Sequence, residues 1–467
     1  MQTTSPPRSR PNIVFVLLDD MGWRDLACYG SSFYETPNID RLAREGMRFT
    51  DAYAASPVCS PTRASILTGK YPANVGLTDW IDSSGTSHPC RGLLVDVPYL
   101  RQLPLQEFNI ARALREHGYQ TWHVGKWHLG GAEYYPGKQG FDYNFGGCEV
   151  GSPPGSYFSP WHIPALANAE PGKYLTDHLT DEAIRLIQNR DQNRPYFLNL
   201  WHYAVHTPIQ APPALVEKYR AKAQRLSLDK MQALERGEPF PTEHKRNQHV
   251  VRRRVQSDPE YAAMIENLDT NIGRLLATVD EKTIVIFTSD NGGLTTAEGS
   301  PTCNFPLAEG KGWMYEGGVR EPLIVRWPGV VEAGSVCEQP VTSPDFYPTL
   351  LQAAGLSPLP NQHCDGISFL PALQGQKFER GPIFWHYPHY GNQGGTPGSS
   401  IRDGDWKLME FFEAGRLELF NLRNDVAEKR NMVLEEPVVA SRLQAILIAW
   451  RQSVEAKIPQ PNLSWKS

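Results

Sequence analysis

The chain has 467 residues, 40% of them hydrophobic, which is enough for one large globular domain with a smaller one beside it. Lysine and arginine total 46 against 51 aspartate and glutamate, giving a net charge of −5. This balance gives no indication of nucleic-acid binding, and any anionic substrate must be held by local cations. No apolar run in the sequence approaches the roughly 20 residues of a membrane span.

The N-terminal residues 1–11 are polar and proline-rich, and the apolar run from Ile13 to Leu18 is too short for the core of a signal peptide. We therefore expect a cytoplasmic protein for the chain as written, or a periplasmic or secreted one if a signal peptide has been removed. The seven cysteines are odd in number and lack C-x-x-C spacing, which argues against a disulfide scaffold and a zinc site, although one pair could bridge.

The run from Ile13 to Leu18 is apolar without interruption and ends in Asp19 and Asp20. Continuous apolarity predicts a strand buried on both faces, as in a parallel sheet, and ligands bind at the carboxyl ends of such strands. Two adjacent carboxylates repel each other unless a cation lies between them. The alternative is a pair of acidic residues that caps a following helix.

The run from Lys282 to Ser289 repeats this pattern and ends in Asp290 and Asn291. With Asp19 and Asp20 these residues offer hard oxygen ligands, which suit calcium or magnesium better than zinc. Between and beyond the two runs, the chain alternates expected helices with expected strands. The helices are 36–46, 109–117, 179–189, 261–278 and 343–354, and the strands are 47–54, 121–124, 195–201 and 323–327.

The pattern changes after about residue 375, where alternating apolar residues predict antiparallel strands at 383–387, 406–411 and 417–421 and a helix at 438–455. We therefore divide the chain into a catalytic domain, 1–375, and a small C-terminal domain, 376–467. The segment 77–107 is a long irregular loop, and loops of this length are often functional. The basic stretch 214–257 predicts a solvated helix face or an excursion from the fold.

The segment from Cys59 to Gly69 is typical of a short helix and its boundaries. Pro61 suits the first helical turn and Gly69 suits the residue after the last turn. Cys59 therefore lies at or just before a helix N-terminus, where we expect the dipole to make its thiol more acidic than a free one. The alternative is a buried structural cysteine.

This segment, which begins Cys59-Ser60-Pro61-Thr62-Arg63, resembles the C-x-P-x-R signature of the type I sulfatases, a family of the alkaline phosphatase superfamily. In that family a maturation enzyme oxidises the cysteine to formylglycine. Other blocks resemble the family in the same order, including G-K-W-H at 125–128 and T-S-D-N-G at 288–292. The matched positions are Asp19, Asp20, Cys59, Arg63, Lys126, His128, His206, Asp290, Asn291 and Lys311.

The resemblance implies an α/β fold with a large mixed, mostly parallel sheet flanked by helices, and a smaller C-terminal antiparallel sheet plus helix. It implies one calcium ion bound by Asp19, Asp20, Asp290 and Asn291. Arg63 and Lys126 would hold the formylglycine hydrate on the metal side, and His206 and Lys311 would bind sulfate and assist the leaving oxygen. Asp290 would accept the proton of the attacking hydroxyl, and His128 would deprotonate the other hydroxyl and so expel sulfate.

The expected activity is hydrolysis of an O-sulfated carbohydrate or an aryl sulfate. A phosphonate or phosphate monoester hydrolase with the same nucleophile is an alternative, and a catalytically silent glycan-binding relative is another. His202 is expected to pack structurally, unlike His206.

The substrate and the oligomeric state stay open. Sugars stack on aromatic rings, so aromatic and histidine residues of several segments are candidates for a substrate rim, although half of them could equally belong to the core. We predict His386, His389, Trp80 and Arg91 as rim residues, and further candidates are His88, Tyr157, Phe158, Trp161, His162, Trp385 and Tyr387.

Overall fold

The computed structural model describes residues 10–83, 90–167, 169–413 and 415–465. In these ranges a central sheet has nine strands in the order β11-β2-β10-β9-β1-β6-β4-β5, with β12 paired to β2. Its neighbouring strands are parallel except for β10, which is antiparallel to β2 and β9. The mixed, mostly parallel sheet predicted from the sequence is thus confirmed. The strands are β1 (Asn12–Leu18), β2 (Met47–Tyr53), β4 (Gln120–Gly125), β5 (Tyr143–Phe145), β6 (Tyr196–Trp201), β9 (Thr283–Ser289), β10 (Arg320–Arg326), β11 (Ser335–Cys337) and β12 (Val341–Thr342).

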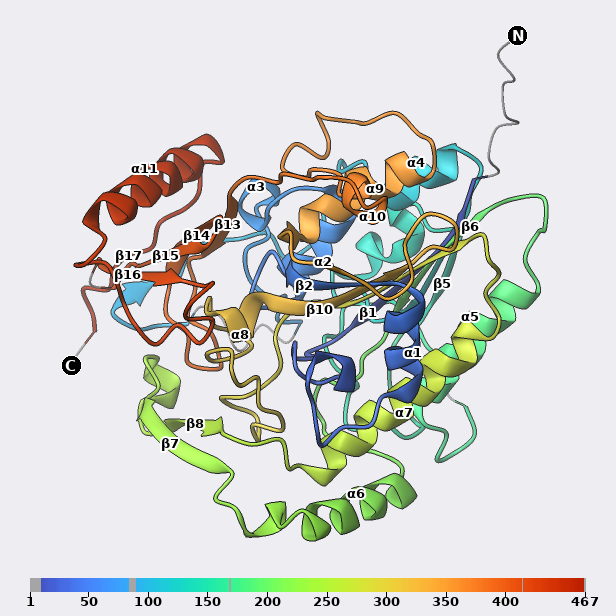
Figure 1. The fold of residues 1–467 in the computed structure, drawn as a ribbon, viewed down its shortest axis with the longest axis horizontal. Helices are drawn as coiled ribbons and strands as arrows, with labels where there is room; N and C mark the ends of the chain where they lie inside the picture. Colours follow the sequence, from blue (N-terminus) through green and yellow to red (C-terminus); the bar gives the residue numbers. More distant parts are fainter. Residues whose placement is uncertain (1–9, 84–89, 168, 414, 466–467) are drawn as a thin grey trace.

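Helices cover both faces of this sheet (Figure 1). Alternate residues of β1 face opposite layers, because successive side chains of a strand point to opposite sides. Val14, Val16 and Leu18 belong to one core, and Ile13, Phe15 and Leu17 belong to the other. The first core includes α1 (Pro37–Glu45), α5 (Leu175–Gln188), α6 (Pro213–Arg225) and α7 (Pro259–Leu276), and the second includes α2 (Cys59–Thr68), α4 (Ile110–Glu116), α9 (Phe346–Ala353) and α10 (Leu370–Leu373).

The C-terminal region forms a second, antiparallel sheet in the order β13-β14-β15-β16, with α11 (Pro437–Ser453) packed against it. Strand β14 was not predicted, since its sequence Gly-Ser-Ser-Ile-Arg-Asp has Ile401 as its single large apolar residue. The division at 375/376 stays a prediction. The strands are β13 (Ile383–Tyr387), β14 (Gly398–Asp403), β15 (Trp406–Phe411) and β16 (Arg416–Asn421).

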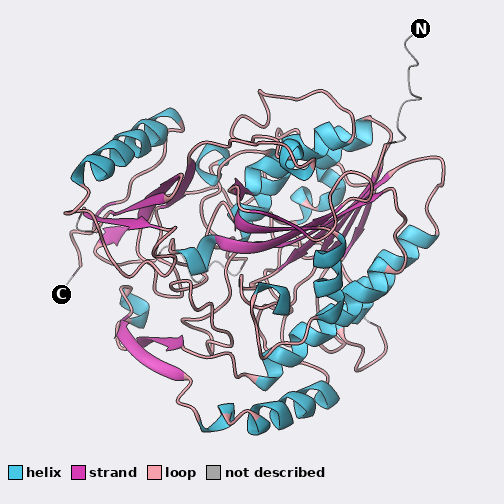
Figure 2. Cartoon of the chain, viewed as in Figure 1, coloured by secondary structure: helices cyan, strands magenta, loops and turns pink. Residues whose placement is uncertain are grey.

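Two small two-stranded sheets lie apart from the central sheet. Strand β17 (Gln460–Pro461) pairs with β3 (Leu94–Val95), so the C-terminus is tied to the long irregular segment near residue 90. Strands β7 (Leu234–Pro239) and β8 (His249–Arg253) form a hairpin outside the central sheet (Figure 2). The basic stretch is therefore an excursion, and Arg252 on it pairs with Glu238 and Glu309.

Two short helices, α3 (Pro72–Val75) and α8 (Glu316–Val319), and six short 3-10 helices make up the rest of the described secondary structure. No disulfide joins the seven cysteines, all of which lie in the described ranges. None of the described helices combines the length and the apolar composition that a bilayer crossing requires.

Candidate active site

Parallel strands bring the predicted site residues to one edge of the sheet. Strands β1, β9, β6 and β4 are neighbours and run parallel, so their carboxyl ends meet at the same edge, where ligands bind in such sheets. Leu18 and Ser289 are register partners, and this places Asp19 beside Asp290. Lys126 directly follows β4, and His206 lies in the loop after β6.

The four oxygen-bearing residues form one buried cluster. Asp20 accepts a hydrogen bond from Asn291 Nδ2 at 2.8 Å, and its own backbone N–H lies 3.3 Å from Asp290 Oδ1. Oδ1 of Asp19 and Oδ1 of Asn291 are buried and receive no hydrogen bond from any described residue. Buried oxygens without donors are costly unless a cation compensates them, so this donor set fits a hard metal ion.

Three cations surround these carboxylates. Lys126 Nζ lies 2.7 Å from Asp19 Oδ2, and Lys311 Nζ lies 2.8 Å from Asp20 Oδ2. Arg63 donates from Nε to Asp290 Oδ2 at 2.8 Å. Burial raises the pKa of Asp290 to about 6, against the opposing effect of Arg63. Burial also acts to raise the pKa of Asp20, but Lys311 and other partners hold it well below its usual range.

Cys59 is the first residue of α2, and the helix ends at Gly69, whose φ of 70° suits glycine. Both boundaries confirm the prediction. The expected acidity of the thiol is wrong, because burial raises the pKa of Cys59 while Lys126 and Lys311 only partly oppose it. Desolvation of the anion therefore outweighs the favourable helix terminus.

His128 is held in one tautomer beside Cys59. Its Nδ1 lies 3.3 Å from Cys59 Sγ, and its Nε2 lies 2.7 Å from the carbonyl oxygen of Ile81. A carbonyl can only accept, so Nε2 carries the hydrogen and Nδ1 presents its lone pair to residue 59. Burial and the charge of Lys126 keep the pKa of His128 well below 6.5, so the ring is a neutral proton acceptor.

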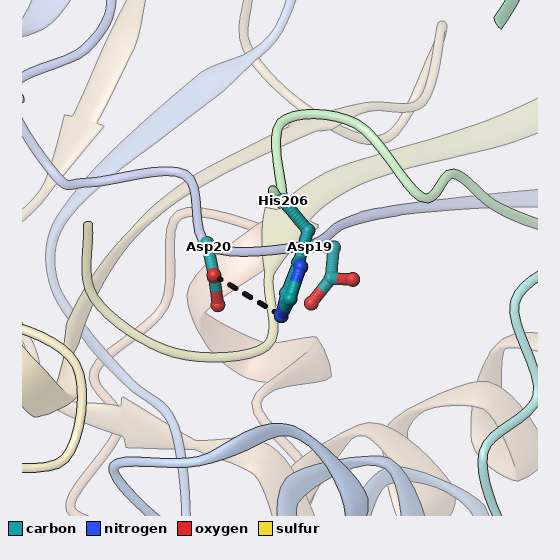
Figure 3. Close-up of side chains that lie close together, drawn as sticks. All are labelled: Asp19, Asp20 and His206. Atoms are coloured by element: carbon teal, nitrogen blue, oxygen red, sulfur yellow. Dashed lines mark ion pairs between the residues drawn. The ribbon is translucent and has the colours of Figure 1, made fainter. Parts of the chain in front are cut away.

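His206 and His202 have different environments, as predicted. His206 lies beside Asp19 and Asp20 (Figure 3), with Nε2 at 3.6 Å from Asp20 Oδ2. His202 is fully buried, and neither of its ring nitrogens has a hydrogen-bond partner among the described residues. Burial lowers the pKa of His202 to about 3, so it is a neutral core residue.

A cavity of about 320 Å³ opens above this cluster. Cys59, His128, His206 and Lys311 line it, so four of the six predicted catalytic groups share one solvent-accessible space, while Arg63 and Lys126 are buried beneath it. Trp80, predicted for the rim, also lines the cavity, as do Glu298 and Gln393, which the sequence analysis missed. Glu298 follows the T-S-D-N-G block closely, and Gln393 lies in a glycine-rich stretch, but neither pattern indicates a site.

The two rim histidines do not reach this cavity, which corrects that expectation. His386 is buried, with its nitrogens 2.7 Å from Ser399 Oγ and 3.0 Å from the carbonyl oxygen of Lys457. His389 is fully buried between Thr78 and Asp96. Both rings therefore fasten the C-terminal sheet to other segments.

The remaining rim candidates have mixed positions. Arg91 is exposed and is not part of the described lining, and its carbonyl oxygen accepts a hydrogen bond from the backbone of Glu243. His88 lies outside the described residues. Four aromatic candidates are buried core residues: Tyr157, Trp161, Trp385 and Tyr387. Phe158 is half-buried against one core, and His162 is exposed; neither lines the described cavity.

Comparison with known proteins agrees with this geometry. The sulfatase family model matches residues 11–356, and the model for the N-sulphoglucosamine sulphohydrolase C-terminal region matches residues 309–452. The chain belongs to the sulfatase family. It is a sulfuric ester hydrolase of the type I, alkaline phosphatase-like class.

Three relatives illustrate the range of the similarity. A sulfatase of Formosa agariphila is 33% identical, covering 99% of this chain and 94% of its own. The N-acetylgalactosamine-6-sulfatase of Canis lupus familiaris is 33% identical over 80% of this chain and 68% of its own. The solved structure of Ps i-CgsB in complex with a neocarrahexaose has a TM-score of 0.75 and 28% identity, covering 98% of this sulfatase and 95% of that chain.

Proposed function

We propose that this sulfatase hydrolyses O-sulfate esters of carbohydrates, using a formylglycine made from Cys59 and one calcium ion. One observation carries the proposal: Sγ of Cys59 and a carboxylate oxygen from each of Asp19 and Asp290 all lie within 4.8 Å of one another. A nucleophile at position 59 and a cation on these carboxylates would therefore meet at the same sulfuryl group. The carbohydrate assignment is supported by the sugar-directed names of the relatives.

The calcium ion would be held by Asp19, Asp20, Asp290 and Asn291. All four offer oxygen, and the two oxygens without hydrogen-bond donors belong to Asp19 and Asn291. Oxygen ligands without histidine or cysteine favour calcium over zinc. When bound, the ion would offset the negative charge on the sulfuryl oxygens and orient the ester.

Residue 59 and His128 would act as a pair. The raised pKa of the Cys59 thiol makes a thiolate nucleophile unfavourable, which supports oxidation by a maturation enzyme to an aldehyde whose hydrate supplies a hydroxyl. Nδ1 of His128 faces this side chain with its lone pair, fixed by the carbonyl of Ile81. His128 would therefore accept a proton from residue 59.

The cationic groups divide into two sets. Lys126 and Arg63 are fully buried against Asp19 and Asp290, so they would orient the cluster beneath the nucleophile. Lys311 and His206 line the cavity, so they would contact the sulfate and protonate the leaving oxygen. Preorganised cations of this kind stabilise the charge that develops in the transition state.

Mass spectrometry of the tryptic peptide Phe49–Arg63 tests the nucleophile. We expect thiol and aldehyde forms in recombinant protein, with sulfatase activity proportional to the aldehyde fraction across preparations. Cys59→Ser and Cys59→Ala should fold and bind calcium but be inactive. Full activity in a preparation that carries only thiol at position 59 would refute the proposal.

A further inference from the structure

A carboxylate stands at the cavity that receives the substrate. Glu298 lies in the chain segment after β9, within a turn in which the Ser300 N–H donates to the Ala297 carbonyl at 2.8 Å. Its φ of 54° is in the left-handed region, which is costly for a residue with a side chain. Glu298 is exposed to solvent yet lines the same cavity as Cys59 and Lys311.

Gln393, from the C-terminal region, fixes the position of this carboxylate. The Gln393 side chain is buried, and its Nε2 donates to Glu298 Oε1 at 2.7 Å. Its backbone carbonyl accepts from Thr296 Oγ1 at 3.0 Å and from Trp313 Nε1 at 3.1 Å. Gln393 is thus held through its backbone carbonyl, and its side-chain amide binds one carboxylate oxygen of Glu298, so the second oxygen of Glu298 can accept hydrogen bonds from a ligand.

The hairpin supports the loop that carries Gln393. Lys245 lies between β7 and β8, and its Nζ donates to the carbonyl of Asn392 at 2.7 Å. Asn392 also lines the cavity. Three separate parts of the chain therefore build this wall: the segment after β9, the C-terminal loop and the hairpin.

The charge of Glu298 reaches the sulfate-facing end of the cavity. Glu298 and Lys311 line the same cavity, so the carboxylate and the ammonium face one shared space. A substrate's sulfate would meet the ammonium of Lys311, whereas a second anionic group on the same sugar would meet the carboxylate of Glu298. Like charges brought close together repel, so such a substrate is disfavoured.

We propose that Glu298, positioned by Gln393, is a specificity determinant that accepts hydrogen bonds from free hydroxyls of a monosulfated sugar and rejects a sugar with a second anionic group. Sugar hydroxyls are good donors to a carboxylate, and charge-assisted hydrogen bonds are stronger than neutral ones. Trp80 lines the same cavity and offers an aromatic surface to the sugar ring. This inference rests on the proposed carbohydrate sulfatase function.

Binding to the inactive Cys59→Ala protein, loaded with calcium, tests the inference without requiring turnover. The probes are galactose and N-acetylgalactosamine carrying sulfate at position 4 or 6, each compared with its 4,6-disulfated form by calorimetry. We expect monosulfated sugars to bind more tightly. Glu298→Gln should weaken the best monosulfated probe about tenfold and reduce the preference over the disulfated form by at least about tenfold.

Three further variants separate recognition from structural damage. Glu298→Asp keeps the charge, so it should still reject the disulfated sugar while binding the monosulfated one less tightly. Gln393→Ala frees the carboxylate, so part of the selectivity should be lost with little change in melting temperature. Glu217→Gln is a matched change on the exposed face of α6 and should leave the preference as it is.

An unchanged preference in Glu298→Gln, or tighter binding of disulfated sugars by the parent protein, would overturn the inference. A failure of the proposed function would look different. In that case the sugars bind with the expected charge selectivity, but protein with aldehyde at position 59 releases no sulfate from them.

Discussion

Lys311 Nζ lies 3.0 Å from Nε2 of His206, so these two side chains of the cavity lining are in direct contact. Nδ1 of His206 lies 2.9 Å from the carbonyl of Thr207, which fixes the hydrogen on Nδ1 and leaves Nε2 to accept from Lys311. Under the proposed function, His206 Nε2 would give a proton to the leaving oxygen and receive one from the ammonium of Lys311, which would become neutral.

Removing this acid should matter most for poor leaving groups. We expect His206→Ala to lower kcat/KM for sugar sulfates by about 10²- to 10³-fold and that for activated aryl sulfates by less than about tenfold. The comparison requires a nitrophenyl sulfate and a sugar sulfate with the same enzyme preparation. Equal losses on both substrates would contradict the role of His206 as a proton donor.

His202 is the matched control, four residues earlier in the same chain segment. Because it is buried and makes no hydrogen bond to a described residue, His202→Ala should lower the free energy of unfolding by about 2–3 kcal/mol, with little preference between the two substrate types. Urea unfolding and the same pair of assays check this. If His202→Ala lost much more activity on sugar sulfates than on aryl sulfates, the assignment of a catalytic role to His206 and a structural role to His202 would be wrong.

The buried neutral state of His202 also predicts a pH dependence. Its folded-state pKa of about 3 lies below the ordinary 6.5, so the unfolded chain binds the proton more tightly. The contribution of neutral His202 to the free energy of unfolding is therefore complete above about pH 6.5. It decreases by about 1.4 kcal/mol per pH unit as the pH falls toward 3. From pH 7 to pH 5 the parent should therefore lose about 2 kcal/mol more than His202→Ala in urea unfolding. Equal losses of unfolding free energy in the parent and in His202→Ala would show that His202 is charged in the folded state.

Calcium binding at the acidic cluster should raise the free energy of unfolding of the protein. Calcium at a hundredfold excess over its Kd stabilises the folded state by about 2.7 kcal/mol, so a chelator should lower the melting temperature of the parent protein. Asp19→Ala should abolish activity and the calcium-dependent shift, while Asp229→Ala on the exposed surface should keep both. A calcium-dependent shift that persists in Asp19→Ala would place the ion elsewhere, and zinc between His128 and His206 would exclude the assignment.

A buried charge network joins the C-terminal sheet to the catalytic region. Lys407 Nζ on β15 lies 2.9 Å from Glu316 and 3.0 Å from Glu428, and all three side chains are fully buried. Lys407→Met leaves Glu428 without an ion-pair partner among the described residues, whereas Glu316 keeps Arg320 at 3.3 Å, so the change should lower the free energy of unfolding by about 3–5 kcal/mol. Lys377→Met removes the exposed pair with Glu379 and should have no measurable effect. Equal free energies of unfolding for the two variants would show that the buried network does not stabilise the fold.

The sequence by itself determined the six longer strands of the central sheet, the motifs and the core of the site. The apolar runs at 13–18 and 284–287 predict parallel strands, and the acids that follow these strands are brought together because parallel strands end at one edge of a sheet. The boundaries of the Cys59 helix could also be predicted from the local sequence, since Pro61 and Gly69 act through their own backbone conformation.

Only the tertiary structure decided the features that depend on burial or on distant segments. The thiol of Cys59 is less acidic than its helix position predicts, because desolvation depends on every element packed around it. His386 and His389 are likewise buried by elements that pack around them from elsewhere in the chain. The sequence pattern of the strand 383–387 had predicted that they lie near the cleft. Glu298 and Gln393 are 95 positions apart in the chain, and no local pattern joins them. Their contact exists because the C-terminal loop folds back onto the segment after β9, which the spacing of residues along the chain does not encode.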